Sequence, residues 1–168
     1  MERVDPRERF PDLIENRVTR DVDAETYDAL GDSEAYTAGW VVVGVVLDPL
    51  ERVLLAYHRD DEAWLLPGGS VHTDESLREA VVREVAEETG VQVEPVRPYA
   101  IVENVVQNDA RARSFTVVFF SADATSTAIG TDLGEPGEPI DRADWFTELP
   151  EAVIERALAK RVLERVRS

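Results

Sequence analysis

Short apolar runs recur along the middle of the chain and predict a set of strands. The β-branched run at residues 39–47 indicates a buried strand, Asp48-Pro49 a turn, and residues 52–58 its hairpin partner. Further strands are predicted at 91–106, 114–121 and 140–146, separated by loops at 107–113 and 130–139.

Two longer stretches have the period of an amphipathic helix. Pro67-Gly68-Gly69 predicts a tight loop, which is followed by Thr73 or Asp74 as a helix cap. The first helix then extends to about Glu88, and Thr89-Gly90 ends it. Residues 150–166 predict the second helix. Strands interleaved with long helices are typical of an α/β fold, in which helices cover a mixed β-sheet.

The amino-terminal residues differ from this pattern. They are rich in acids, contain Pro6 and Pro11, and offer one short helix at residues 21–30. We interpret residues 1–35 as an N-terminal extension, partly helical, that caps the core or a partner subunit or simply lies on the surface. Residues 36–168 have the length of one domain with a full core.

The helix after the glycine loop carries carboxylates where apolar side chains are expected. At about 100° per residue, its apolar residues fall on one arc: Leu77, Ala80, Val81 and Val85. Glu84, Glu87 and Glu88 fall inside or beside that arc. Like charges at this spacing repel, the helix end is itself negative, and burial removes water, so a cation must compensate. The alternative is an exposed face on which Arg83 and other arginines pair with the glutamates.

The amino-acid composition limits which partners and metals the chain can bind. The chain has 35 acidic and 18 basic residues, a formal charge of −17, and a single lysine, Lys160, so it lacks the basic clusters that bind nucleic acid duplexes. The absence of cysteine excludes disulfides and zinc–thiolate sites. Carboxylate oxygens without neighbouring cysteine or histidine favour Mg²⁺, with Mn²⁺ as a substitute.

Composition also predicts a location. No apolar run is long enough to span a membrane and no signal peptide is visible, so we expect a cytoplasmic protein without a membrane partner. The acid excess with one lysine resembles proteins of salt-accumulating, halophilic organisms, in whose cytoplasm salt screens self-repulsion.

One uninterrupted motif matches a known family. Gly69 is followed after five residues by Glu75, and after seven more by Arg83-Glu84, Val85, Ala86, Glu87-Glu88, Thr89, Gly90 and Val91. This resembles a complete Nudix box. The resemblance implies an α/β/α sandwich over residues 36–168. It also implies hydrolysis of a nucleoside diphosphate linked to another moiety, such as ADP-ribose, a nucleoside triphosphate or a dinucleoside polyphosphate.

The resemblance also implies roles for the box residues. Glu84, Glu87 and Glu88 correspond to metal ligands, which the backbone carbonyl of Gly69 joins. Glu75, Arg83 and Gly68 correspond to positions that support the loop and helix. The ions neutralise the diphosphate and lower the pKa of water, and a general base then takes a proton.

The general base and the substrate contacts remain open in the sequence. Family members use either a box glutamate, here Glu87, or a later acid, for which Glu138 is our preferred candidate and Glu103 and Glu135 are alternatives. A solvated loop carboxylate is the simpler interpretation of Glu138.

Other polar and aromatic residues also have two interpretations. Arg111 and Arg113 are candidates to clamp phosphate, or belong to a solvated loop. Phe115 is a candidate to stack on a base, or belongs to the core. His72, at a variable position of the box, has the features of a surface histidine.

The sequence is compatible with three kinds of function. A hydrolase of small nucleotides is favoured, because a catalytically silent nucleotide-binding regulator would tolerate replacement of Glu84, Glu87 or Glu88, and none is replaced. An acidic interaction module would not need glutamates on an apolar helix face. The family often forms homodimers, and the sequence leaves the oligomeric state open.

Overall fold

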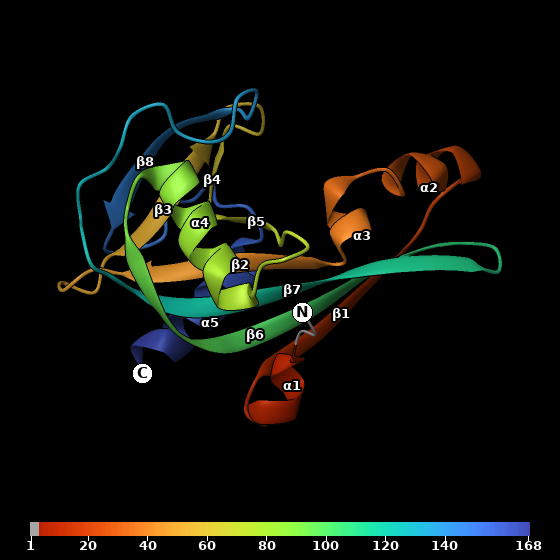
Figure 1. The fold of residues 1–168 in the computed structure, drawn as a ribbon, viewed down its shortest axis with the longest axis horizontal. Helices are drawn as coiled ribbons and strands as arrows, with labels where there is room; N and C mark the ends of the chain where they lie inside the picture. The colour runs from red at the N-terminus through yellow and green to blue at the C-terminus, as the bar shows by residue number, and fades with distance from the viewer. Residues whose placement is uncertain (1–3) are drawn as a thin grey trace.

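The computed structural model describes residues 4–168, in which eight strands form one mixed, open sheet (Figure 1). Its main path runs in the order β1-β6-β7-β2-β3-β4, with β5 beside β2 and β8 beside β3. The strands are β1 (Ile14–Asp21), β2 (Trp40–Leu47), β3 (Val53–His58), β4 (Ala63–Leu65), β5 (Gly68–Ser70), β6 (Val93–Asn108), β7 (Arg111–Ala124) and β8 (Ile140–Phe146).

Helices cover both faces of this sheet. α4 (Leu77–Thr89) packs on one face and α5 (Arg156–Arg167) on the other, each over its own apolar cluster. Three short helices precede them: α1 (Pro6–Arg9), α2 (Ala24–Leu30) and α3 (Glu34–Ala38). No helix within residues 4–168 is long and apolar enough to cross a bilayer. The predicted α/β fold, a mixed sheet between helices, is confirmed.

Strand β2 lies at the centre of the sheet, which explains its continuous apolar sequence. Val42 and Val46 face the α4 cluster, whereas Val45 faces the α5 cluster. The predicted hairpin with β3 is wrong beyond its turn, because Leu47 and Val53 form the only register pair between the two strands within residues 4–168. Elsewhere β2 pairs with β7 on one side and with β5 on the other, so β3 pairs with β4 and β8 instead.

Several predicted boundaries also move. The expected tight loop at Gly68 and Gly69 is a short strand, β5, because β2 offers it a free edge. The polar loop expected at 107–113 is a two-residue turn between the long strands β6 and β7, with Asp109 in the left-handed region. Helix α5 begins at Arg156 and not near residue 150, since Val153 first bridges to Trp64.

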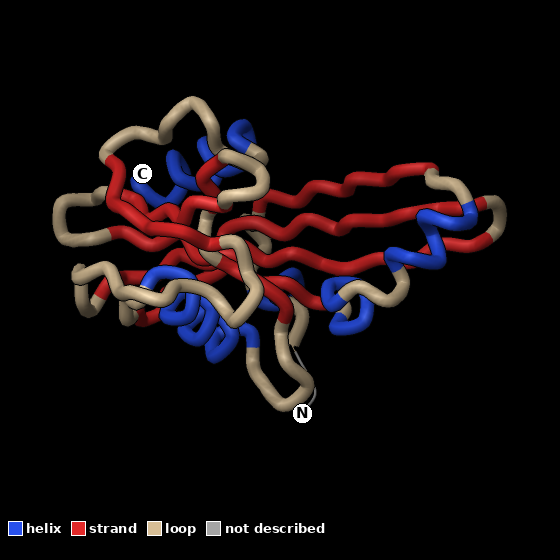
Figure 2. The backbone as a smooth tube through the Cα atoms, turned by 90° about the horizontal axis from the view of Figure 1, so that it is seen from above, coloured by secondary structure: helices blue, strands red, loops and turns tan. Residues whose placement is uncertain are grey.

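The amino-terminal residues contribute a strand that the sequence pattern did not predict. β1 runs parallel to β6 along eight residue pairs and forms one edge of the sheet. Its burial does not alternate, because only Ile14 is buried. The predicted helix at 21–30 is shorter, since Asp21 ends β1 and Asp23 caps α2. The β6–β7 hairpin extends with α2 beyond the main helices (Figure 2).

Candidate active site

Helix α4 is fixed by its two ends. Ser76 caps it and forms a capping box with Glu79, so the helix starts after the predicted caps Thr73 and Asp74. Gly90 ends it with φ 78°, a left-handed conformation that suits glycine. The predicted apolar arc is confirmed, and Glu84 and Glu88 are buried on the same helix, at 7% and 2% exposure. Carboxylates therefore do point into the protein.

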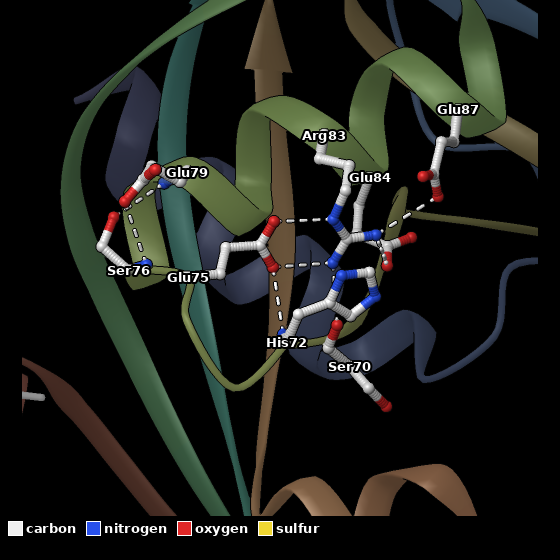
Figure 3. Close-up of polar contacts among 8 residues, drawn as sticks. All are labelled: Ser70, His72, Glu75, Ser76, Glu79, Arg83, Glu84 and Glu87. Carbon is white, nitrogen blue, oxygen red and sulfur yellow. Dashed lines mark hydrogen bonds and ion pairs between the residues drawn. The ribbon is translucent and has the colours of Figure 1, made fainter. Parts of the chain in front are cut away.

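Arg83 connects the helix to the loop before it (Figure 3). Its Nε and Nη2 donate to the two carboxylate oxygens of Glu75 at 2.7 and 2.8 Å, and Nη2 also donates to the Ser70 carbonyl. Arg83 Nη1 donates to Glu84 at 2.7 Å and to Glu87 at 3.3 Å. These bonds lower the pKa of the Glu75 carboxyl, and they match a supporting role for this pair.

Glu88 and Glu84 are the two carboxylates of the site whose ionised form is unfavourable. Burial, together with the charges of Glu84 and Glu138, raises the pKa of Glu88 to about 9. Burial also raises the pKa of Glu84 to about 7, although the bond from Arg83 opposes the shift. Glu88 Oε1 accepts a long hydrogen bond of 3.4 Å from the Gly68 N–H, and its buried Oε2 has no partner within residues 4–168. An ionised carboxylate here needs a compensating positive charge.

The two glycines of β5 are required by close packing. A Cβ on Gly69 would lie 2.5 Å from the Glu84 carboxyl carbon, and a Cβ on Gly68 would lie 2.2 Å from the Val42 carbonyl oxygen. Any side chain would therefore push the carboxylates away or separate β5 from β2. The backbone of Gly68 and Gly69 can approach a ligand held by these carboxylates.

Glu138 lies within electrostatic range of the buried glutamates. The loop that carries it is held against the end of α4, where the Gly134 N–H donates to the Glu87 carbonyl and the Gly130 N–H to the Thr89 carbonyl. The charge of Glu138 contributes to the raised pKa of both Glu84 and Glu88. The structure therefore brings Glu138 toward the box glutamates, where it can act as an additional carboxylate of the site.

The other predicted site residues lie elsewhere. Glu103 is on β6, separated from β5 by β7 and β2, and its charge acts on Arg7 of α1. Arg111 and Arg113 lie over the Tyr27 ring of α2, at 4.4 and 4.1 Å from its centroid, near the tip of the β6–β7 hairpin.

Two further contacts bear on the roles predicted for Arg111 and His72. Arg111 also pairs with Asp28 of α2, so the phosphate-clamp interpretation loses its geometric support. His72 donates its backbone N–H to Glu75, a contact that any residue type could make.

The carboxylates of the site suit a hard divalent cation, but in this arrangement they do not form a complete set of metal ligands. Within residues 4–168, no group of three acidic or histidine side chains is close enough to hold a metal, because Arg83 bonds to Glu84 and Glu87 while Glu88 turns toward Gly68. The partnerless Oε2 of Glu88 and the raised pKa values are what an ion would relieve. Movement of Arg83 away from Glu84 would free an oxygen for it.

A groove of about 530 Å³ crosses the opposite face of the sheet. Strands β1, β6, β7 and β2 form its floor, while α5 and Tyr36 of α3 form its ends. Phe115, which lines this groove, contacts Tyr36 edge to face at 4.9 Å. Asn16 and Arg20 of this groove could not be predicted to lie there, because the sequence pattern does not predict β1.

The chain is similar in sequence to known phosphatases of oxidised nucleotides. The chain is 31% identical over 116 residues to an 8-oxo-dGDP phosphatase of Homo sapiens, covering 66% of this chain and 33% of the relative. It is 47% identical over 55 residues to a putative 8-oxo-dGTP diphosphatase of Bacillus subtilis, covering 33% of this chain and 36% of the relative. The matches thus span about one third of the length of these two relatives.

Solved structures share the fold. A MutT NUDIX hydrolase from Burkholderia pseudomallei superposes with a TM-score of 0.58 at 24% identity, over 76% of this chain and 96% of the other. An ADP-ribose pyrophosphatase from Streptococcus suis superposes with a TM-score of 0.55 at 24% identity, over 77% of this chain and 92% of the other. The family model described as NUDIX domain matches residues 38–163. The chain therefore belongs to the NUDIX domain family.

Proposed function

We propose that this protein is a Mg²⁺-dependent hydrolase that cleaves the pyrophosphate linkage of a small nucleoside diphosphate derivative. The observation that carries the proposal is the burial of Glu84 and Glu88 against Gly68 and Gly69, with one oxygen of Glu88 left without a partner. Mn²⁺ would substitute, since it takes the same oxygen ligands. Relatives named as ADP-ribose pyrophosphatase and 8-oxo-dGDP phosphatase support this class of substrate.

Glu84, Glu87 and Glu88 would hold the cation, joined by the backbone carbonyl of Gly69. When bound, Mg²⁺ neutralises phosphate oxygens and lowers the pKa of water. Ionised Glu88 and Glu84 would then no longer be unfavourable, because their charges would be compensated. Glu75 and Arg83 would hold the loop and helix in register, and Gly68 would keep β5 against β2.

The general base would be a carboxylate at the edge of this cluster. Glu87 is the most exposed of the three box glutamates, with 29% of its side chain exposed, and Glu138 is carried by the loop that is hydrogen-bonded to the same helix end. Either group would accept a proton from water and release it to solvent. We favour Glu138, because it is not needed to hold the ion. The effect of its charge on the pKa of Glu84 and Glu88 supports this choice over Glu103.

The test is a product-release screen over ADP-ribose, nucleoside triphosphates, 8-oxo nucleotides and dinucleoside polyphosphates. Each substrate would be assayed with Mg²⁺, with Mn²⁺ and with EDTA, at low and at high salt. We expect metal-dependent release of a nucleoside monophosphate or of pyrophosphate from at least one of them. Tight binding without turnover of any substrate would instead favour a silent regulatory module.

A further inference from the structure

A pocket lies between the amino-terminal segment and the start of α4, on the sheet face opposite to the groove. We call it the α1 pocket. Residues 4–10, the first turn of α4 and strands β6 and β7 line it. Its volume of about 410 Å³ lies within the range of about 300–1,000 Å³ typical of small-molecule sites. In the described chain, every residue that lines it is apolar except Ser76, Arg9 and Arg78.

The floor of the α1 pocket reaches the hydrophobic core. Leu77 and Phe120, which are 8% and 4% exposed, belong to the apolar cluster under α4. Phe10 is half-buried and Val96 is 50% exposed, so apolar surface continues from the floor to the rim. Covering apolar surface contributes about 25 cal/mol per Å², which favours a ligand with an apolar body.

The charge of the α1 pocket is positive, in contrast to that of the whole chain. Arg9 and Arg78 line it, although the chain has 35 acidic and only 18 basic residues. Within residues 4–168, Arg9 has no hydrogen bond and no ion pair. Arg78 donates from Nη1 to the Val96 carbonyl at 3.2 Å and from Nη2 to the Pro95 carbonyl, so its partners are uncharged. Two guanidinium groups without a carboxylate partner can bind an anion.

The α1 pocket is separate from the proposed metal site. Leu77 is the first residue of α4, whereas Glu84 and Glu88 follow about two and three turns later. Among residues 4–168, those that line the pocket include no box glutamate and neither glycine of β5. One wall, residues 4–10, also precedes residues 38–163, which the family model matches. The pocket therefore depends on the amino-terminal segment of this chain.

We propose that the α1 pocket binds a small amphiphilic carboxylate, a molecule with one carboxylate on an apolar body. The body covers the floor at Leu77 and Phe120, and the carboxylate pairs with Arg9 and Arg78. A nucleotide polyphosphate would leave the apolar walls exposed to water, and an uncharged hydrocarbon would leave both arginines without a partner. This binding is independent of the proposed hydrolysis, because no metal ligand takes part in it.

The first test uses octanoate as the probe, in EDTA so that its carboxylate cannot bind through a metal ion. NMR titrations of the wild type with octanoate, 1-octanol and acetate separate the two parts of the ligand. We expect octanoate to bind at millimolar concentration and to shift the Leu77 and Val96 amide signals. Octanol should bind about fivefold more weakly, and acetate should give no measurable shift. Molar KCl should weaken octanoate relative to octanol, because salt screens the ion pair.

The second test adds a negative charge at the rim. Val96→Asp and Val96→Asn have side chains of the same size, and both should fold because Val96 is exposed. Octanoate should bind Val96→Asp about tenfold more weakly than Val96→Asn, whereas octanol should bind both equally.

The third test removes one positive charge from the rim. Arg9→Gln should weaken octanoate binding about threefold. The matched control is Arg161→Gln, an exposed arginine of α5 that does not line the pocket, which should bind octanoate like the wild type.

Four results would overturn the proposal. Equal affinity for octanoate and octanol would exclude a role for the arginines, and equal octanoate binding by Val96→Asp and Val96→Asn would place the ligand elsewhere. The wild type could also fail to bind octanoate at millimolar concentration. Binding that appears only in a variant without Glu2 and Arg3 would assign the pocket to the chain's own amino terminus.

Discussion

Helices α4 and α5 have similar lengths and cover opposite faces of the same sheet, but they bury different chemistry. α5 buries Ala159, Val162 and Leu163, and its charged residues are exposed or only half-buried. α4 buries an apolar stripe together with Glu84 and Glu88. Packing alone explains α5. The difference shows that α4 buries charge that apolar packing does not compensate, which is why we propose a ligand there and not at α5.

The largest expected effect comes from removing one α4 carboxylate. Glu87→Gln should lower turnover at least a hundredfold with the fold intact, because the amide loses the charge that holds a cation. The matched control is Glu164→Gln on the exposed side of α5, which should leave turnover unchanged. Steady-state kinetics with circular dichroism on both variants makes the comparison. Equal activity in Glu87→Gln and the wild type would refute the metal assignment.

The next effect concerns Arg83, which connects α4 to the loop before it. Arg83→Ala leaves Glu75, whose side chain is 13% exposed, without its bidentate partner. The free energy of unfolding should fall by about 1–3 kcal/mol, as measured by urea denaturation.

Arg83→Lys provides the control for charge. Lysine restores the charge but not the paired geometry, so it should recover only part of the loss. Full recovery in the lysine variant would show that charge alone, without the fork of two bonds, supports the loop.

A third prediction concerns pH in the absence of metal. Folding raises the pKa of Glu88 from 4.5 to about 9 and that of Glu84 from 4.5 to about 7. The folded state therefore binds more protons than the unfolded state above pH 4.5, and stability should fall as pH rises through both values. Melting temperatures in EDTA would measure this fall. Glu88→Gln should flatten the curve, whereas an identical curve in that variant would exclude Glu88 as its source.

The smallest effect concerns the excess of acidic residues over the whole chain, which α5, with five basic residues and one acid, does not share. With a formal charge of −17, self-repulsion should destabilise the protein in dilute buffer. Molar KCl shortens the Debye length to about 3 Å and should raise Tm by several degrees. A Tm that does not change with KCl would contradict the halophilic interpretation.

The same contrast explains what the sequence could predict. The apolar arc of α4 was predictable because burial follows the helical period, and its start was missed by two or three residues because Ser76, Thr73 and Asp74 are all competent caps. The box glutamates were predictable because their spacing is local. The sequence offered Glu138 as the preferred general base. Its place in the molecule follows only from the hydrogen bonds between its loop and the end of α4.

The features that depend on distant contacts were not predictable. β1 has one buried residue and no alternation, so its place beside β6 leaves no period in the sequence. Gly68 and Gly69 form a strand only because β2 has an open edge there. Arg111 and Arg113 were phosphate candidates until the fold placed Tyr27 against both. Register and loop packing come from the tertiary structure.

The most direct test of the central claim is Mg²⁺ binding by isothermal titration calorimetry on the wild type, Glu88→Gln and Glu164→Gln. The claim is that the buried carboxylates of α4 hold a divalent cation. The wild type and Glu164→Gln should then bind Mg²⁺ with the same affinity, and Glu88→Gln should bind at least tenfold more weakly. Equal affinity in all three proteins, or no binding to the wild type, would contradict it.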